Sequence, residues 1–260
     1  MSGRAAEYLL LSERVGQFQS NFEFATEREF PHDSGLFFSR LENTVVRLNA
    51  PSQTAWRVPP LLKVAYTAFM AVLVPLYWRY FGPTDFLYFC NVALILTWIA
   101  IWPENALLIS MCAVGIVVPQ LLWVIDFASI AAGFPLIGIT NYMFDAGNSL
   151  LLRLLSLFHV WLPLLLVYLV RKTGYDRRGF WLWTTLSWGL LLICFFAMPA
   201  PTPNPRLAPV NINYVWGLNN MAAQTWVSPY IWLTGLVVGL PLLVFAPAHF
   251  LLARFAPKAR

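Results

Sequence analysis

The sequence predicts an all-α fold, a polytopic membrane helix bundle of about six transmembrane helices with a polar N-terminal segment. Of its 260 residues, 59% are hydrophobic and only 11% are charged, whereas a soluble domain carries about 25% charged residues. The apolar residues also gather in uncharged runs close to the roughly 20 residues that cross a bilayer as a helix. A mean hydropathy of +0.63 agrees with a chain whose main solvent is lipid.

Three parts follow one another along the chain. Residues 1–58 are polar and mixed in charge, and we expect a cytoplasmic or interfacial segment there. Glu7 and Glu13 lie where a cleavable signal peptide would be apolar, so no such peptide is expected. Residues 59–255 form the predicted transmembrane domain, and residues 256–260 form a short basic C-terminal tail.

The spans are placed by length and by lack of charge. They are predicted at residues 61–78, 86–102, 106–125, 150–170, 180–198 and 230–253. The stretch 127–149 is apolar enough to extend the third span, to lie in the interface, to re-enter the membrane or to form a seventh span. The stretch 199–229 is rich in proline and asparagine, which predicts a loop.

The basic residues predict the orientation. Two groups follow even-numbered spans, and they consist of Arg171, Lys172, Arg177 and Arg178, and of Arg254, Lys258 and Arg260. With six spans, both groups share a side with the basic N-terminal segment, and a seventh span would break this agreement. Because lysine and arginine are enriched in cytoplasmic loops, both termini are predicted to be cytoplasmic in a plasma or inner membrane. The net charge of +5 then reflects topology, and no nucleic-acid partner is expected.

The composition gives no reason to expect a metal or a cofactor. The three cysteines lack C-x-x-C spacing, which argues against a zinc site and against a disulfide framework. Haem bound by two histidines is disfavoured too, because His159 and His249 are predicted to lie in opposite leaflets.

Polar residues from separate segments fall in the outer leaflet of this topology. Cys90 and Asn91 begin the second span, in the stretch "YFCNVALILTWIAIW". His159 lies in the fourth span, about 9 Å deeper than Arg153 at 1.5 Å per residue. Ionisable residues inside spans are functional candidates by default. The candidate site residues are Cys90, Asn91, Asp126, His159, Asn213 and Tyr214.

Each candidate also has a structural explanation. A single membrane cysteine such as Cys90 is more often part of the packing, and Asp126 could mark a helix end in water. Asn213 and Tyr214 could cap a loop. Pro163 removes the N–H that would bond to the carbonyl of His159, so a kink beside the imidazole is predicted.

Three stretches resemble YwaF-like integral membrane proteins in order and spacing. They are "LYFCNVALIL", "LSLFHVWLPLLLVYLV", and "NINYVWGLNN" followed by "SPYIWL". They match a cysteine-bearing span, a histidine-bearing span and an Asn-Tyr-aromatic motif, and the resemblance covers roughly residues 83–245. Relatives in that superfamily include vertebrate transmembrane acyltransferases that use a cysteine and a histidine on phospholipids.

The resemblance implies a catalytic pair, because the family cysteine corresponds to Cys90 and the family histidine to His159. The expected function is a phospholipid acyltransferase or lipid hydrolase acting on membrane lipids at the outer-leaflet interface. Asn91 or Asn213 would donate to the oxyanion, Asp126 would orient His159, and Tyr214 completes the matched Asn-Tyr pair.

A non-catalytic membrane protein is the alternative. It would be a subunit or scaffold of a membrane complex, with other membrane proteins as partners. A small-solute transporter is the weaker form of this alternative. Transporters of this kind contain inverted repeats with binding sites at the bilayer midplane, whereas no convincing repeat is found here and the polar residues lie to one side.

Overall fold

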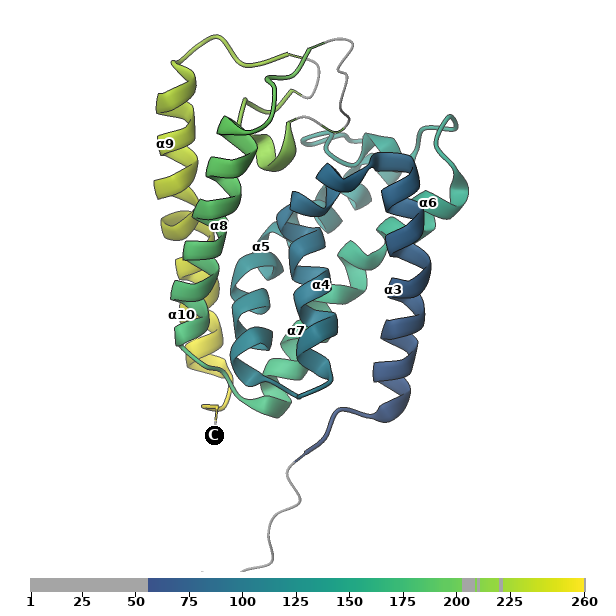
Figure 1. Cartoon of the computed structure of the whole chain (residues 1–260), viewed down its shortest axis with the longest axis vertical. Helices are drawn as coiled ribbons and strands as arrows, with labels where there is room; N and C mark the ends of the chain where they lie inside the picture. Colours follow the sequence, from purple (N-terminus) through teal and green to yellow (C-terminus); the bar gives the residue numbers. More distant parts are fainter. Residues whose placement is uncertain (1–55, 203–208, 210, 220–221, 260) are drawn as a thin grey trace, which may run out of the picture. The chain divides into compact units, whose positions relative to one another are not determined.

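The computed structural model describes residues 56–202, 209, 211–219 and 222–259. Nearly all of the predicted N-terminal segment lies outside this range. The described chain is helical, with one isolated bridge between Tyr175 and Lys258. Its helical elements, labelled in part in Figure 1, are α3 (Pro60–Phe81), η1 (Pro83–Leu87), α4 (Phe89–Ile101), α5 (Ala106–Ala131), η2 (Asn141–Met143), α6 (Leu150–Ser156), α7 (Phe158–Thr173), α8 (Arg178–Phe196), η3 (Ile212–Tyr214), α9 (Pro229–Gly239), the π-helical η4 (Leu240–Phe245) and α10 (Ala246–Phe255).

Five of the six predicted spans are long and apolar enough to cross a membrane. They are Pro60–Phe81, Ala106–Ala131, Leu150–Thr173, Arg178–Phe196 and Pro229–Phe255. The prediction of an all-α integral membrane protein is confirmed at this level. The second predicted span is shorter than expected, because α4 has 13 residues. Its length is about 20 Å, roughly 10 Å less than the hydrocarbon core of a bilayer.

The stretch 127–149 extends the third span and then leaves it. Helix α5 continues to Ala131, beyond the predicted end of this span. Between α5 and α6, the chain has only the three-residue turn η2. Among the described helices, therefore, none corresponds to a seventh span.

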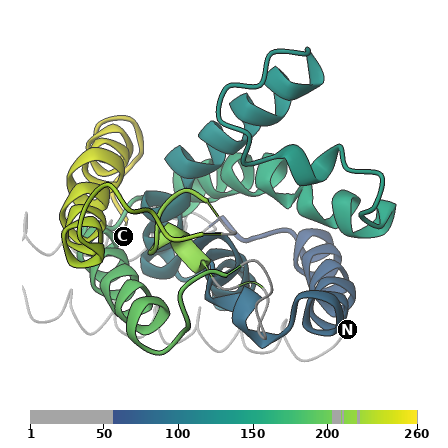
Figure 2. The ribbon, with the colours of Figure 1, turned by 90° about the horizontal axis from the view of Figure 1, so that it is seen from above.

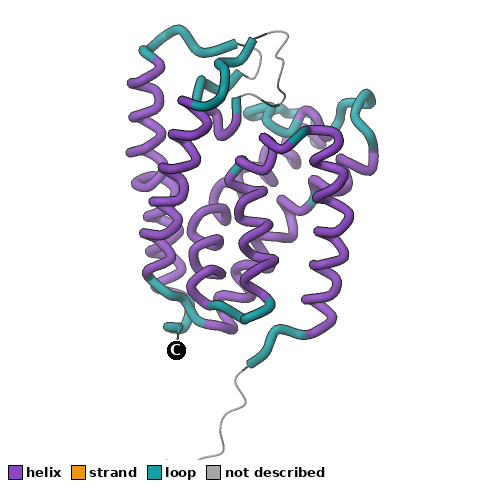
Figure 3. Tube along the Cα trace, viewed as in Figure 1, coloured by secondary structure: helices purple, strands orange, loops and turns teal. Residues whose placement is uncertain are grey.

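The loops gather at two ends of the described bundle, as the tube in Figure 3 shows. At the first end, Lys63 at the start of α3 pairs with Glu104 at 2.7 Å, and the α7–α8 connection pairs with the C-terminal tail. We call it the basic end. The other end carries η1, η2 and η3, and we call it the loop end. The candidate site residues lie toward the loop end.

Helix α5 contacts α4, α7 and α8, so it lies at the centre of the packing. Helix α8 approaches α5 closely because each of the two helices has a glycine at the contact. A Cβ atom at Gly115 would overlap the indole of Trp183, and one at Gly179 would lie 2.7 Å from the backbone nitrogen of Met111. Small residues allow such close contact between membrane helices. Figure 2, from above, shows α9 and α10 on one side of the bundle and α3 on another.

The fourth span contains an irregular point that the sequence did not predict. Helix α7 continues through Pro163, and the kink expected there stays a prediction. The break lies at Leu157, between α6 and α7. There, the backbone N–H of Val160 bonds to the carbonyl of Leu157, at 2.9 Å, in a tighter turn than that of an α-helix.

Candidate functional site

Cys90 is the second residue of α4, and its side chain is partly buried. The backbone N–H groups of Cys90 and Asn91 both lie within hydrogen-bonding reach of its sulfur. Free N–H groups and the helix dipole make such a position favourable for a negative charge. These N–H groups favour a thiolate, whereas burial of the sulfur and the charge of the nearby Asp85 oppose one.

An acidic residue that the sequence did not single out lies beside this cysteine. Asp85 in η1 is only 8% exposed. The Nδ2 atom of Asn91 donates to both the carbonyl and the Oδ2 of Asp85, each at 2.8 Å. Burial raises the pKa of Asp85 to about 6, and the hydrogen bond from Asn91 acts in the opposite direction. When ionised, this carboxylate opposes a second negative charge on Cys90.

The amide of Asn91 is thus already engaged. Both of its N–H bonds point to Asp85, and its Oδ1 is buried without a hydrogen-bond partner. A side-chain amide NH2 group has only two hydrogens to donate. The predicted role of Asn91 as an oxyanion donor does not fit this arrangement, in which the residue holds η1 against α4.

Asn213 caps α4 from a distant part of the chain. Its Oδ1 accepts from the backbone N–H of Phe89 at 3.0 Å. Its Nδ2 donates to the carbonyl of Leu87 at 2.9 Å and lies 3.8 Å from the sulfur of Cys194. The predicted role of Asn213 as an oxyanion donor is therefore replaced by a capping role. The cap has a physical reason, because the first N–H groups of a helix have no partner within the helix.

Tyr214 follows Asn213 in the same turn. Both residues have a positive φ, 55° for Asn213 and 59° for Tyr214, which is uncommon for residues other than glycine. The carbonyl of Tyr214 accepts from Nε1 of Trp232 at 2.8 Å. Burial raises the pKa of the Tyr214 phenol, and the charges of Cys90 and Asp126 act in the same direction. Tyr214 therefore lies within electrostatic range of both residues.

Asp126 has a different role from the predicted one. It is fully buried, and its Oδ1 accepts from the backbone N–H groups of Ile137 and Gly138, each at 2.9 Å. Its Oδ2 accepts from the backbone N–H and the hydroxyl of Thr140, at 2.9 and 2.8 Å. These four bonds fasten the 132–149 loop to the end of α5. The carboxylate is used there, so its predicted role of orienting His159 is not what the geometry shows.

His159 is oriented by its own chain and by aromatic rings. Its Nδ1 lies 2.8 Å from the carbonyl of Ser156, which is not used by Val160 because of the tight turn at Leu157. A carbonyl only accepts, so Nδ1 carries the proton, and Nε2 of the neutral ring holds the lone pair. The ring stacks on Trp123 and Phe158, with centroids 4.8 and 4.1 Å away.

Tyr142 in η2 connects the surroundings of Cys90 and His159. Burial raises the pKa of its phenol to about 12, while hydrogen bonds to Ser156 and Trp123 lower it and the charge of Cys90 raises it. Ser156 also bonds to the hydroxyl of Tyr77 at 2.9 Å. Sequence analysis did not select Tyr77, Asp85, Trp123 or Tyr142. Of these four, only Tyr142 could have been noticed in the sequence, because it lies in the stretch 127–149, whose placement the sequence left open.

The other described histidine lies apart from this group. His249 is on α10, and its Nδ1 bonds to the hydroxyl of Tyr175 at 2.6 Å. Tyr175 belongs to the α7–α8 connection at the basic end. His249 therefore offers a matched control for experiments on His159.

The chain matches no protein-family model, no curated protein and no solved structure in the comparisons made with it. The long apolar helices show an integral membrane helical protein.

Proposed function

We propose that this protein is a Cys/His-dependent phospholipid acyltransferase or lipid hydrolase that acts at the outer-leaflet interface. The observation that carries the proposal is the arrangement at the loop end. Cys90 lies at the N-terminus of α4, and Nε2 of His159 carries a lone pair that can accept a proton. Tyr142 bonds to Ser156 and Trp123, which contact His159, and it lies within electrostatic range of Cys90. The resemblance to YwaF-like proteins supplies the chemical class and is itself part of the proposal.

The reaction begins when the Cys90 thiol gives its proton to Nε2 of His159. The thiolate then attacks the carbonyl carbon of a glycerophospholipid ester. The tetrahedral intermediate collapses, and the C–O bond breaks. The departing lysolipid oxygen takes the proton back from His159, which leaves an acyl thioester on Cys90. A lysolipid hydroxyl or a water molecule, deprotonated by His159, then accepts the acyl group and regenerates the thiol.

The depth of α4 supports an ester substrate. Because α4 is about 10 Å shorter than the hydrocarbon core, its N-terminus can lie below one membrane surface. Phospholipid esters lie near the boundary between headgroups and hydrocarbon. The shortness of this helix therefore suits a cysteine that has to meet an ester carbonyl within the membrane.

A hydroxyl is the best candidate for stabilising the oxyanion, because the amides of Asn91 and Asn213 are engaged. Tyr142 is the most exposed tyrosine of the group, with 37% of the residue's surface exposed, and its hydroxyl would exchange its bond to Ser156 for one to the oxyanion. We assign it this role. Loss of one such donor lowers the rate of known enzymes by about a hundred- to a thousand-fold.

The proposal is tested by lipidomics of cells that express the wild type, Cys90→Ala or His159→Ala. Cys112→Ala and His249→Ala are the matched controls, because Cys112 is fully buried and His249 lies at the basic end. We expect an altered acyl composition with the wild type and with both controls only. Identical profiles for the wild type, Cys90→Ala and His159→Ala would reject the enzyme.

A non-catalytic membrane subunit or scaffold is the second candidate function. It is favoured by one observation, that Asp85, Asn91, Asp126 and Asn213 mostly satisfy one another or the backbone. A cluster of this kind also serves to specify a fold. Copurification with other membrane proteins, together with unchanged lipids, would support this candidate.

The proposed location is the plasma or inner membrane, with both termini in the cytoplasm. The basic end would then face the cytoplasm, because it carries Arg171, Lys172 and Arg254. Accessibility of single cysteines in intact cells tests the orientation. A membrane-impermeant maleimide should label a cysteine at Asn148, in the exposed loop, and should not label one at Lys172.

A further inference from the structure

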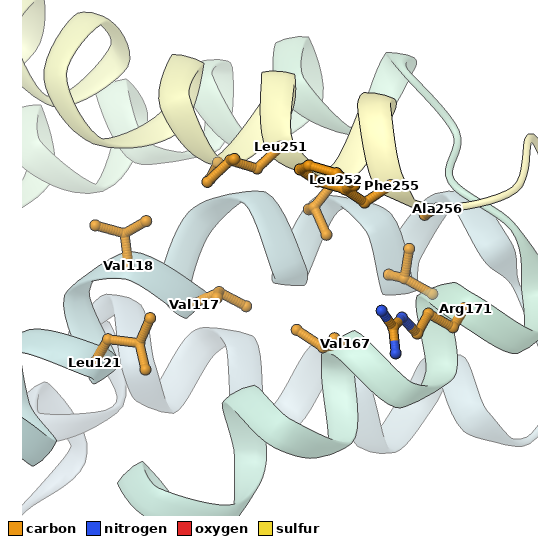
Figure 4. Close-up of a pocket in the computed structure, with 11 residues that line it drawn as sticks. Val117, Val118, Leu121, Val167, Arg171, Leu251, Leu252, Phe255 and Ala256 are labelled. Atoms are coloured by element: carbon orange, nitrogen blue, oxygen red, sulfur yellow. The ribbon is translucent and has the colours of Figure 1, made fainter.

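A cavity lies between α5, α7 and α10, away from the Cys90 and His159 residues. Its volume is about 280 Å³. The apolar part of its wall includes Val117, Val118, Leu121, Val167, Leu251 and Phe255, and Arg171 is its one charged lining residue. Figure 4 shows Arg171 beside Ala256 at one end of the cavity, with Val118 and Leu121 at the other.

The direction of the cavity matches that of a membrane lipid. Arg171 lies in the last turn of α7, at the basic end. Leu121 lies 15 residues beyond the start of α5, which is about 22 Å along the helix and near mid-membrane. The cavity is therefore charged at the membrane surface and apolar toward the bilayer centre. Leu121, Leu251 and Phe255 are 47%, 56% and 71% exposed, so its rim is open to lipid.

The charge of Arg171 selects the headgroup. Two described acids at the basic end already have partners, since Glu104 pairs with Lys63 and Asp176 pairs with Arg178. Within the described chain, neither of these ion pairs involves Arg171. Guanidinium groups bind phosphate in a bidentate manner, and basic residues at a cytoplasmic membrane surface attract anionic lipids.

We infer that this cavity binds one acyl chain of an anionic phospholipid, whose phosphate is held by Arg171. The volume lies just below the roughly 300 Å³ at which pockets for whole drug-sized ligands begin, so it accommodates part of one chain and leaves the remainder in the bilayer. The site is independent of the proposed catalytic pair. It is a structural or regulatory lipid site at the opposite end of the bundle.

The experiment uses the full chain, purified and reconstituted into liposomes. The probes are a phosphatidylglycerol and a phosphatidylcholine that carry the same acyl-chain diazirine. After irradiation, the cross-linked peptides are identified by mass spectrometry. We expect phosphatidylglycerol to label the peptides that contain Leu121 or Leu251 about five-fold more than phosphatidylcholine does, the effect of roughly one basic residue near the surface.

Four variants sharpen the result. Arg171→Gln should remove the five-fold preference, whereas Lys172→Gln should retain it, because both side chains are exposed but Lys172 does not line the cavity. Val118→Phe should lower labelling by both lipids, since its larger side chain fills the cavity. Cys90→Ala should label like the wild type, which separates this site from the proposed activity.

Equal labelling by the two lipids would overturn the inference. A preference for phosphatidylglycerol that survives in Arg171→Gln would also overturn it. So would lipid labelling found only on peptides from other helices.

Discussion

The side-chain Oδ1 of Asn213 accepts a hydrogen bond from the backbone N–H of Phe89 at 3.0 Å, across 124 residues of sequence. This contact joins η3 to the first residue of α4, directly before Cys90. It holds the start of α4, one residue before Cys90.

Two substitutions at Asn213 separate its cap from its backbone conformation. Asn213→Gly should cost about 1 kcal/mol of unfolding free energy, because it removes the cap but tolerates a φ of 55°. Asn213→Ala should cost about 1 kcal/mol more, because Ala disfavours that φ. Thermal unfolding in detergent measures both. Equal stability of Asn213→Ala and the wild type would contradict the cap.

Asp85 predicts a pH dependence of stability. Its pKa in the folded protein is about 6, above the ordinary value of 3.8. A raised pKa means that its stabilising effect is complete below about pH 4 and is lost as the pH rises through 6. The unfolding free energy should fall by up to about 3 kcal/mol over this range.

The check on Asp85 is the difference between the thermal stabilities of the wild type and Asp85→Asn from pH 4 to pH 8. The variant should lack the Asp85 part of the pH dependence. If both proteins lose the same stability as the pH rises, then the carboxyl is not buried as described.

Asp126 should control the 132–149 loop. Asp126→Ala removes four hydrogen bonds to a fully buried carboxylate, and we expect a loss of about 3–4 kcal/mol. Limited proteolysis should then cut the loop. Asp145→Ala is the control, because among the described residues the Asp145 side chain bonds to Gly147 and Asn148 of the same loop. If Asp126→Ala resists protease like the control, the four bonds do not hold the loop.

Trp188 should stabilise the proline-containing last span. Its Nε1 donates to the carbonyl of Val237 at 2.8 Å, which Pro241, lacking an N–H, cannot bond in an α-helical pattern. Trp188→Phe should cost about 1–2 kcal/mol, measured by thermal unfolding in detergent. Trp181→Phe, at a 68% exposed position, should cost less than 0.5 kcal/mol. Similar losses in the two variants would show that the hydrogen bond contributes little.

The sequence predicted the apolar helices well, because length and lack of charge determine which segments can cross a membrane. It did not predict the start of α4. The uncharged run begins at residue 86, but α4 begins at Phe89, where Asn213 bonds to the backbone N–H of Phe89 and Asn91 bonds to Asp85. These contacts form only in the folded chain. The sequence also did not predict the break at Leu157. It predicted a kink only at Pro163, because proline is the residue type known to disturb a helix.

For the candidate site, the sequence placed all six residues toward one end but did not give the hydrogen-bond partners that three of them have in the structure. Asn91, Asp126 and Asn213 each serve to hold a loop or a helix start. Hydrogen-bond partners of amide and carboxylate groups depend on the tertiary fold, and residue type alone does not determine them. The roles of Cys90 and His159 stay a prediction, and the carbonyl of Ser156, rather than Asp126, bonds to the imidazole.

The most direct measurement is the intact mass of the purified protein after incubation with phospholipid liposomes. We predict an added acyl group on the peptide that contains Cys90, removable by neutral hydroxylamine and absent in His159→Ala. Neither Cys112→Ala nor His249→Ala should change it. An unmodified Cys90 in the wild type, with no lysolipid released, would contradict a lipid-modifying thiol and leave the loop end as a structural cluster.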